Sequence, residues 1–222
     1  MIRDLRTGLK LMRYAYGVKT NLTQAGVVLA MGLLYNLGEG GIGNGFGNLF
    51  FMSMAIIPVQ LCYSLSVSDF VKTSPMRKRM QTSVPALIHC FIAALIYLAE
   101  VLLFGLVCLG NPELEGDMCR NILSLAVMAA AMMFYLGICY KFYLVSSVFL
   151  ILFLSTWFLG GLSVGKYFLD FFSRSESSFR SAALLGLGIV ALGGAAEYLG
   201  TLLVYRAPLS KMAQQASLRK AL

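Results

Sequence analysis

Charged residues are scarce in this sequence, and their scarcity excludes an ordinary soluble domain. Asp, Glu, Lys and Arg make up 13% of the 222 residues, whereas soluble domains carry about 25%. Hydrophobic residues reach 59%, and the mean hydropathy is +0.77. This composition is typical of an integral membrane protein. Because each span needs roughly 20 apolar residues, we expect about six membrane helices in one domain and no appended soluble domain.

Residues that build catalytic and metal centres are also few. His89 is the only histidine, and no acidic residue lies within one helical turn of it, which argues against a metal site. A Ser-His dyad could use His89 alone, no GxSxG motif is present, and the EExxxR arrangement of membrane prenyl-protease relatives is missing. We therefore expect no enzyme, no metal and no cofactor.

The five cysteines form no CxxC pair, and most of them lie inside apolar runs. This placement predicts small buried hydrophobic side chains. The residues are Cys62, Cys90, Cys108, Cys119 and Cys139. A disulfide is plausible only between Cys108 and Cys119, which stand at the outer ends of two consecutive apolar segments.

Two glycine patterns imitate nucleotide-binding motifs without their context. Gly160–Lys166 matches GxxxxGK, but Tyr167 follows where Ser or Thr must reach the magnesium ion. GxGxxG-like spacing occurs in the loop Gly38–Gly47 and again in Gly186–Ala191, yet neither follows a strand or precedes a crossover helix. We interpret these patterns as a flexible outer turn and as close helix packing, and we expect no nucleotide site.

Apolar periodicity predicts an all-α membrane protein with a single transmembrane domain, residues 1–222. Near the N-terminus, Ile2, Leu5, Leu9, Met12 and Tyr16 recur at helical spacing between cations, which predicts an amphipathic interfacial helix over residues 1–20. A six-span bundle over residues 21–206 and a cytoplasmic tail over 207–222 follow. The predicted apolar segments are Leu22–Leu37, Leu49–Val67, Val84–Leu109, Ile122–Tyr140, Tyr143–Val164 and Ala182–Tyr205. A break near Lys141, between the fourth and fifth segments, is essential to the count.

The distribution of the cations orients the predicted spans. With six spans, most of the eighteen Lys and Arg residues fall on one side. They are Arg3, Arg6, Lys10, Arg13, Lys19, Lys72, Arg77, Lys78, Arg79, Lys141, Arg206, Lys211, Arg219 and Lys220. Cytoplasmic loops carry such an excess, so we expect a multi-pass protein of the cell membrane with both termini cytoplasmic. The net charge of +8 then faces the lipid bilayer and the cytoplasm, and we expect no nucleic-acid partner.

Two glutamates stand inside predicted spans, where an ionised side chain costs several kcal/mol unless it is neutral, paired or hydrated. Glu100 and Glu197 belong to the third and sixth segments. One reading is a proton or substrate contact that faces a cavity. The other is a protonated or hydrogen-bonded glutamate that joins helices. Its possible partners are Tyr97, Tyr198 and Tyr205.

The loop Asp69–Met80, with four cations between the second and third segments, completes a layout that resembles the permease subunit of ABC-2-type ABC transporters. In that family this loop holds a coupling helix that contacts a separate ATPase subunit. The resemblance implies coupling through Lys72, Pro75, Arg77, Lys78 and Arg79. It also implies a helix that starts at Pro75 with Ser74 as its cap. The outer segment Lys166–Arg180 matches the short outer helices that precede the family's last span.

The resemblance further implies an exporter that binds no ATP itself and pairs with an ATP-binding subunit and a second permease copy or homologue. A plain topology signal explains the cations of the loop equally well. Two other functions remain open. One is the substrate-binding component of an energy-coupling-factor importer, a family that docks through an AxxxA face on its first span; here the first span offers Ala25, Gly26, Ala30 and Gly32, which do not copy that face. The other is a non-transporting immunity or assembly partner.

Overall fold

The computed structural model describes residues 2–15, 18–37, 46–67, 71, 73–139, 141–158, 178–208 and 210–211. Helices are the only regular elements in these ranges. They are α1 (Ile2–Met12), α2 (Val18–Leu37), α3 (Phe46–Val67), α5 (Arg77–Gln81), α6 (Ser83–Gly110), the 3-10 turn η1 (Pro112–Leu114), α7 (Glu115–Cys139), α8 (Tyr143–Phe158) and α10 (Phe179–Val204). The predicted all-helical fold class is confirmed over this part of the chain.

Three of these segments are long and apolar enough to cross a membrane. They are Ser83–Gly110, Pro112–Cys139 and Phe179–Val204. The first holds 28 residues, about 42 Å of helix against a hydrocarbon core of about 30 Å. Two shorter apolar helical segments, Phe50–Tyr63 and Tyr143–Trp157, accompany them. The six-span count itself stays a prediction.

The helix limits follow the apolar pattern of the sequence closely. Each of the six predicted apolar segments overlaps a helix over the residues that the structure describes, although α7 begins at Glu115 and not at Ile122, and α2 at Val18 and not at Leu22. The expected break near Lys141 is present, because α7 ends at Cys139 and α8 begins at Tyr143. Lys141 and Phe142 both donate their backbone N–H groups to the carbonyl of Ile138, which closes the turn between the two helices.

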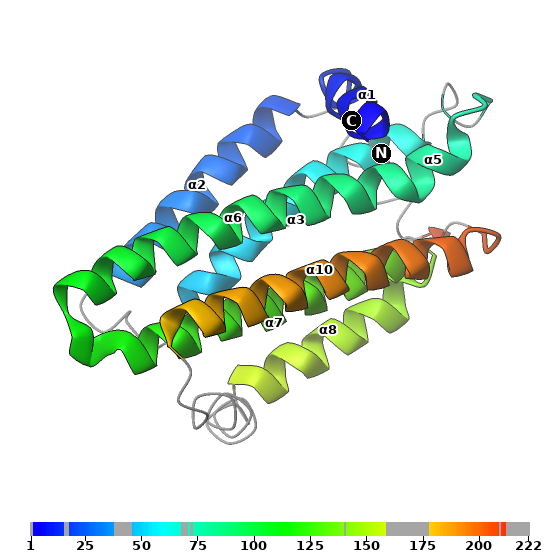
Figure 1. Ribbon diagram of the computed structural model, residues 1–222. Coiled ribbons are helices and arrows are strands. Elements are labelled where there is room, and N and C mark those ends of the chain that lie inside the picture. Colours follow the sequence, from blue (N-terminus) through cyan, green and yellow to red (C-terminus); the bar gives the residue numbers. More distant parts are fainter. Residues whose placement is uncertain are drawn as a thin grey trace.

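The long helices alternate in direction, so that their ends gather at two opposite ends of the bundle (Figure 1). α1, α5, the α7–α8 turn and the C-terminal end of α10 lie at one end, which we name the basic end. η1 and the N-terminal end of α10 lie at the other. α7 packs against α10, α6, α3 and α8, whereas α2 contacts mainly α3. The core is therefore centred on α7.

Glycines let α10 approach α6 and α7 closely. A Cβ at Gly193 would lie 2.8 Å from the Cα of Ala130 on α7, and one at Gly194 would lie 2.5 Å from Cys90 Sγ on α6. Gly186 packs against the Tyr97 ring, whereas Gly188 faces open space. The interpretation of Gly186–Ala191 as packing glycines is thus right for the first position and wrong for the second. The reason is that one turn of helix presents only some positions to a neighbour.

The cysteines remain free thiols. Cys62, Cys119 and Cys139 are buried, and Cys90 and Cys108 are partly buried. The disulfide considered between Cys108 and Cys119 is not formed. The interpretation as small buried side chains holds best for the first three residues.

Candidate functional site

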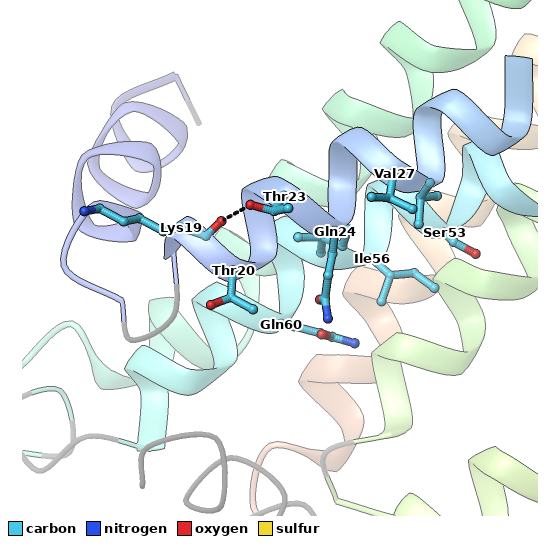
Figure 2. Close-up of a pocket in the computed structure, with 10 residues that line it drawn as sticks. Lys19, Thr20, Thr23, Gln24, Val27, Ser53, Ile56 and Gln60 are labelled. Atoms are coloured by element: carbon cyan, nitrogen blue, oxygen red, sulfur yellow. Dashed lines mark hydrogen bonds between the residues drawn. The ribbon is translucent and has the colours of Figure 1, made fainter.

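A groove of about 790 Å³ lies between α2 and α3 and begins close to the basic end (Figure 2). Its wall combines hydroxyl, carboxamide and aliphatic side chains. They belong to Lys19, Thr20, Thr23, Gln24, Val27, Val28, Ser53, Ile56, Ile57 and Gln60. Thr20, Thr23 and Gln24 fall on one face of α2 because they follow helical spacing.

The carboxamides of this groove have an unusual environment. Gln24 and Gln60 are exposed. On α2, Gln24 follows the exposed polar residues Thr20 and Thr23, whereas the exposed side chains further along the helix, such as Leu34, are apolar. The Thr23 hydroxyl donates to the Lys19 carbonyl at 3.1 Å, so its hydrogen-bond donor is satisfied within α2. An amide at membrane depth without a partner costs about 1–3 kcal/mol or more. The groove therefore suits water, a polar solute or another polar surface better than it suits lipid.

Three exposed cations stand side by side on α5, at the basic end of the bundle. Arg77, Lys78 and Arg79 are exposed, while the following Met80 and Gln81 are buried. The cationic turn is thus presented outward and its last residues anchor it to the core. Of the other predicted coupling residues, Pro75 is exposed in the turn before α5, and Lys72 lies outside the described residues.

The predicted start of the short helix is wrong by two residues. α5 begins at Arg77 with Met76 as its N-cap, and not at Pro75 with Ser74 as the cap. The Ser74 hydroxyl accepts the Met76 N–H at 3.1 Å, and the Ser74 carbonyl accepts the Arg77 N–H at 3.1 Å. Ser74 therefore closes a local turn two residues on, a known alternative use of a serine that could cap a helix.

The cations of this end gather around the C-terminal end of α10. Lys78 Nζ lies 6.0 Å from the centre of the Tyr205 ring, and Lys141 Nζ donates to the Ala207 carbonyl at 2.7 Å. Burial and then the positive charge of Arg77 lower the pKa of Lys141 below its ordinary value. Cations at this helix end also complement its dipole.

The opposite end of the bundle carries three acidic residues together with Arg120 and Arg180. The acidic residues are Glu113 of η1 and Glu115 and Asp117 of the first turn of α7, and Asp117 pairs with Arg120 at 3.5 Å. Glu115 Oε1 accepts the backbone N–H of Phe179 at 2.9 Å, so an anion satisfies the first turn of α10. Charge of opposite sign thus marks the two ends of the same bundle.

α1 lies against the first turns of α6 and against α3. Gly8 faces Val84 and Ile88 of α6, and a Cβ there would lie 2.5 Å from Val84 Cγ1. Arg6, Lys10 and Arg13 are exposed on other faces. The predicted amphipathic helix is present, with part of its apolar face docked on protein.

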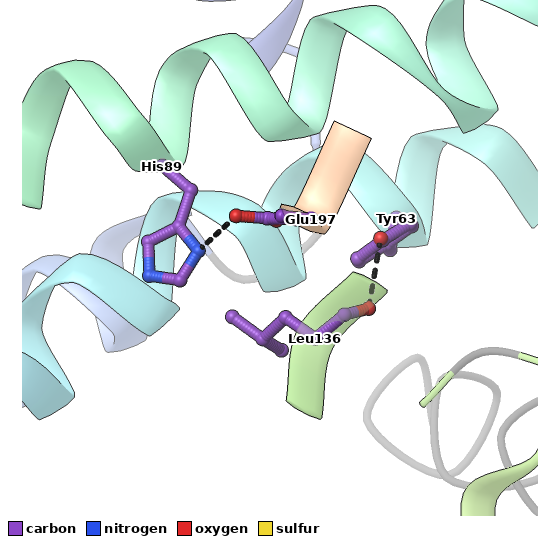
Figure 3. A network of polar contacts seen from close by, with 4 residues as sticks. All are labelled: Tyr63, His89, Leu136 and Glu197. Atoms are coloured by element: carbon purple, nitrogen blue, oxygen red, sulfur yellow. Dashed lines mark hydrogen bonds and ion pairs between the residues drawn. The ribbon is translucent and has the colours of Figure 1, made fainter. Parts of the chain in front are cut away.

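A buried hydrogen-bonded pair joins α6 to α10. His89 Nδ1 lies 2.8 Å from Glu197 Oε2, and the two side chains are 1% and 0% exposed (Figure 3). The second oxygen, Glu197 Oε1, has no hydrogen-bond partner among the described residues. In the same region the Tyr63 hydroxyl donates to the Leu136 carbonyl at 3.2 Å, which ties α3 to α7.

The pair corrects the predicted partners of Glu197. Tyr97 donates instead to the Ala183 carbonyl at 2.9 Å, and Tyr205 faces Lys78. Glu100 is also buried, but it lies about 16 Å further along α6 than His89, so the two predicted glutamates do not form one site. The residues within one helical turn of His89 do not include Glu197, because the two residues are 108 positions apart in the sequence.

No group of three or more His, Cys, Asp or Glu side chains that could hold a metal ion occurs within the described ranges. No protein-family model, no curated protein and no solved structure matches the chain. The groove between α2 and α3, the basic end and the buried pair therefore provide the basis for a functional proposal.

Proposed function

We propose that this chain is the membrane-spanning permease subunit of an ABC-2-type exporter. It lies in the cell membrane with six spans and cytoplasmic termini, pairs with a second permease, and couples to ATP hydrolysis by a separate subunit. The described part of the chain carries helices long enough for such a protein.

One observation carries the proposal: α5 presents three neighbouring cations outward between the second and third long helices, at the same end as α1. A short helix anchored by buried residues at its end can transmit a push to the helix that follows it. Only Thr82 separates α5 from α6, and its hydroxyl donates to the Lys78 carbonyl at 2.7 Å. Movement of α5 would therefore be passed directly to α6.

The groove between α2 and α3 supports transport over a purely structural role. Exposed carboxamides on helices within a membrane are unfavourable, so a membrane protein with a purely structural role gains nothing from them. A transporter does gain, because they can line a hydrophilic passage. α2 contacts mainly α3 and leaves its other faces open. A second permease placed against this side would enclose the groove as one wall of a pathway.

The charge difference between the two ends supports the orientation. Cytoplasmic loops are enriched in Lys and Arg, and the basic end holds α5, Lys141 and Arg206, whereas the opposite end holds the acidic run that begins at Glu113. An ATPase subunit acts in the cytoplasm, so the proposed docking helix and the proposed cytoplasmic end coincide.

The test is purification of the tagged chain from membranes of its own cells, followed by assay for an associated ATPase. We expect the double variant Arg77→Glu/Lys78→Glu to lose at least ten-fold of the associated ATP hydrolysis. The matched double variant at the opposite end, Arg120→Glu/Arg180→Glu, should keep it. Equal ATPase yield from both variants, each present in the membrane fraction and monodisperse in detergent, would refute coupling through α5.

A further inference from the structure

A second groove, of about 460 Å³, lies between α6 and α10. Small side chains leave space for the groove, and its wall is mainly apolar. The lining residues are Ser83, Ala86, Leu87, Cys90, Gly194, Ala195 and Tyr198. The close approach of Gly194 to Cys90 marks the contact between the two helices inside this groove. His89 and Glu197, on the same two helices, do not line this groove.

The groove runs from the basic end into the apolar part of the bundle. Ser83 is the first residue of α6 and donates its hydroxyl to the Arg79 carbonyl of α5 at 3.4 Å. Cys90 lies about 10 Å further along the helix axis. A chain-like apolar molecule that lies between α6 and α10 would therefore have one end beside α5.

Cations surround that end without acidic partners. Lys78 of α5 places its Nζ over the Tyr205 ring, directly after the C-terminal end of α10. Arg206 is exposed immediately after Tyr205, and Lys141 is bonded to Ala207. Among the described residues, none of these three cations forms an ion pair with a carboxylate. Neighbouring like charges repel, and a bound anion would offset that repulsion.

We infer that this groove binds an anionic glycerophospholipid, with one acyl chain along Ala86, Cys90 and Ala195 and the phosphate at Lys78 and Arg206. A soluble phosphate would make no favourable contact with the apolar wall, and a zwitterionic lipid would gain little binding energy from the unpaired cations. Basic clusters between membrane helices on the cytoplasmic side are suited to anionic head groups. The inference rests on the membrane-spanning part of the proposed function and is independent of ATPase coupling.

The test uses the full chain alone, reconstituted in phosphatidylcholine vesicles with a small fraction of photoreactive phosphatidylglycerol or photoreactive phosphatidylcholine. The photoreactive group sits in the acyl chain, and crosslinked peptides are mapped by mass spectrometry. We expect crosslinks on the segments Ser83–Cys90 and Gly194–Tyr198, at least five-fold stronger with phosphatidylglycerol. Equal crosslinking by the two lipids, or crosslinks spread over all exposed helices, would overturn the inference.

Two sets of variants separate the acyl site from the charge site. Ala195→Trp should fill the groove and remove the crosslinks, whereas Leu199→Trp, on an exposed position of the same helix, should keep them. Lys78→Gln/Arg206→Gln should abolish the preference for phosphatidylglycerol and leave weak crosslinks from both lipids. Unchanged crosslinking in all three variants would also overturn it. Because no ATPase is present, failure here leaves the coupling proposal to its own test.

Discussion

Two polar features of the molecule, the His89–Glu197 pair and the groove between α2 and α3, solve the same physical problem in opposite ways. The pair joins α6 to α10 through one contact, His89 Nδ1 to Glu197 Oε2, and both side chains are almost completely excluded from solvent, while Glu197 Oε1 has no partner among the described residues. The groove leaves Gln24 and Gln60 exposed beside hydroxyl and aliphatic side chains of α2 and α3. Polarity that is closed within the chain holds helices together, whereas polarity left open has to be satisfied by something outside the chain.

The largest effect on stability is expected from breaking the His89–Glu197 pair. His89→Leu leaves the fully buried Glu197 carboxyl group without its hydrogen-bond partner and should lower the free energy of unfolding by about 3 kcal/mol or more. Thermal or denaturant unfolding of the purified protein in detergent measures the change. The double variant His89→Leu/Glu197→Leu should cost much less than the sum of the two single variants. Additive costs would show that the pair is not coupled in the folded protein.

Overpacking beside the pair should have the next largest effect. Gly193→Ala places a Cβ 2.8 Å from the Ala130 backbone, and crowding of this kind costs about 1–3 kcal/mol. The same unfolding measurement applies. Gly188→Ala is the matched control on the same helix, because no atom lies within 4 Å of its Cβ position. If Gly188→Ala destabilised the protein as much as Gly193→Ala, close packing of α10 would not be the cause.

The groove between α2 and α3 is tested by its accessibility to a water-soluble reagent and not by a measurement of stability. In a cysteine-free background, Gln60→Cys should react with a water-soluble thiol reagent at least ten-fold faster than Leu34→Cys, which lies on an apolar exposed face of α2. Mass spectrometry of the labelled protein in vesicles gives both rates. Similar rates at the two positions would show that the groove is not hydrated, and the contrast with the buried pair would lose its basis.

The smallest effect is expected at the basic end. Burial and then Arg77 lower the pKa of Lys141 in the folded protein from its ordinary value of 10.5, so the unfolded chain binds more protons at alkaline pH. Stability should therefore rise with pH between the lowered pKa and the ordinary value. Lys141→Arg does not titrate in this range and should lack the rise. Parallel pH profiles of the melting temperature for both proteins would contradict the assignment.

Several features could be predicted from local sequence because they depend on local physics. Apolar runs fixed the helices, the break between Cys139 and Tyr143 followed from Lys141 between two runs, and α1 followed from its amphipathic spacing. The polar face of α2 could have been found in the same way, since Thr20, Thr23 and Gln24 follow helical spacing. Its significance came only with Gln60 of α3 beside it.

Local sequence was insufficient to predict hydrogen bonds where one side chain has several possible partners. Ser74 had the chemistry of a helix cap, but its hydroxyl bonded to Met76 in a turn, and α5 started later. Tyr97 had the chemistry of a partner for a buried glutamate, but the packing of Gly186 against its ring directs the hydroxyl to Ala183. In both cases the residue type was informative, and the choice among several possible partners depended on geometry.

The helices, their apolar character and the spread of charge along the chain could all be inferred from the amino-acid sequence, because these properties belong to single segments. The contact between Glu197 and His89, 108 positions apart, and the position of Lys78 over Tyr205 at the end of α10 became visible only in the folded chain. Helix formation depends on neighbours in the chain, whereas a buried polar group is stabilised by whichever residue the packing of distant helices brings within hydrogen-bonding distance.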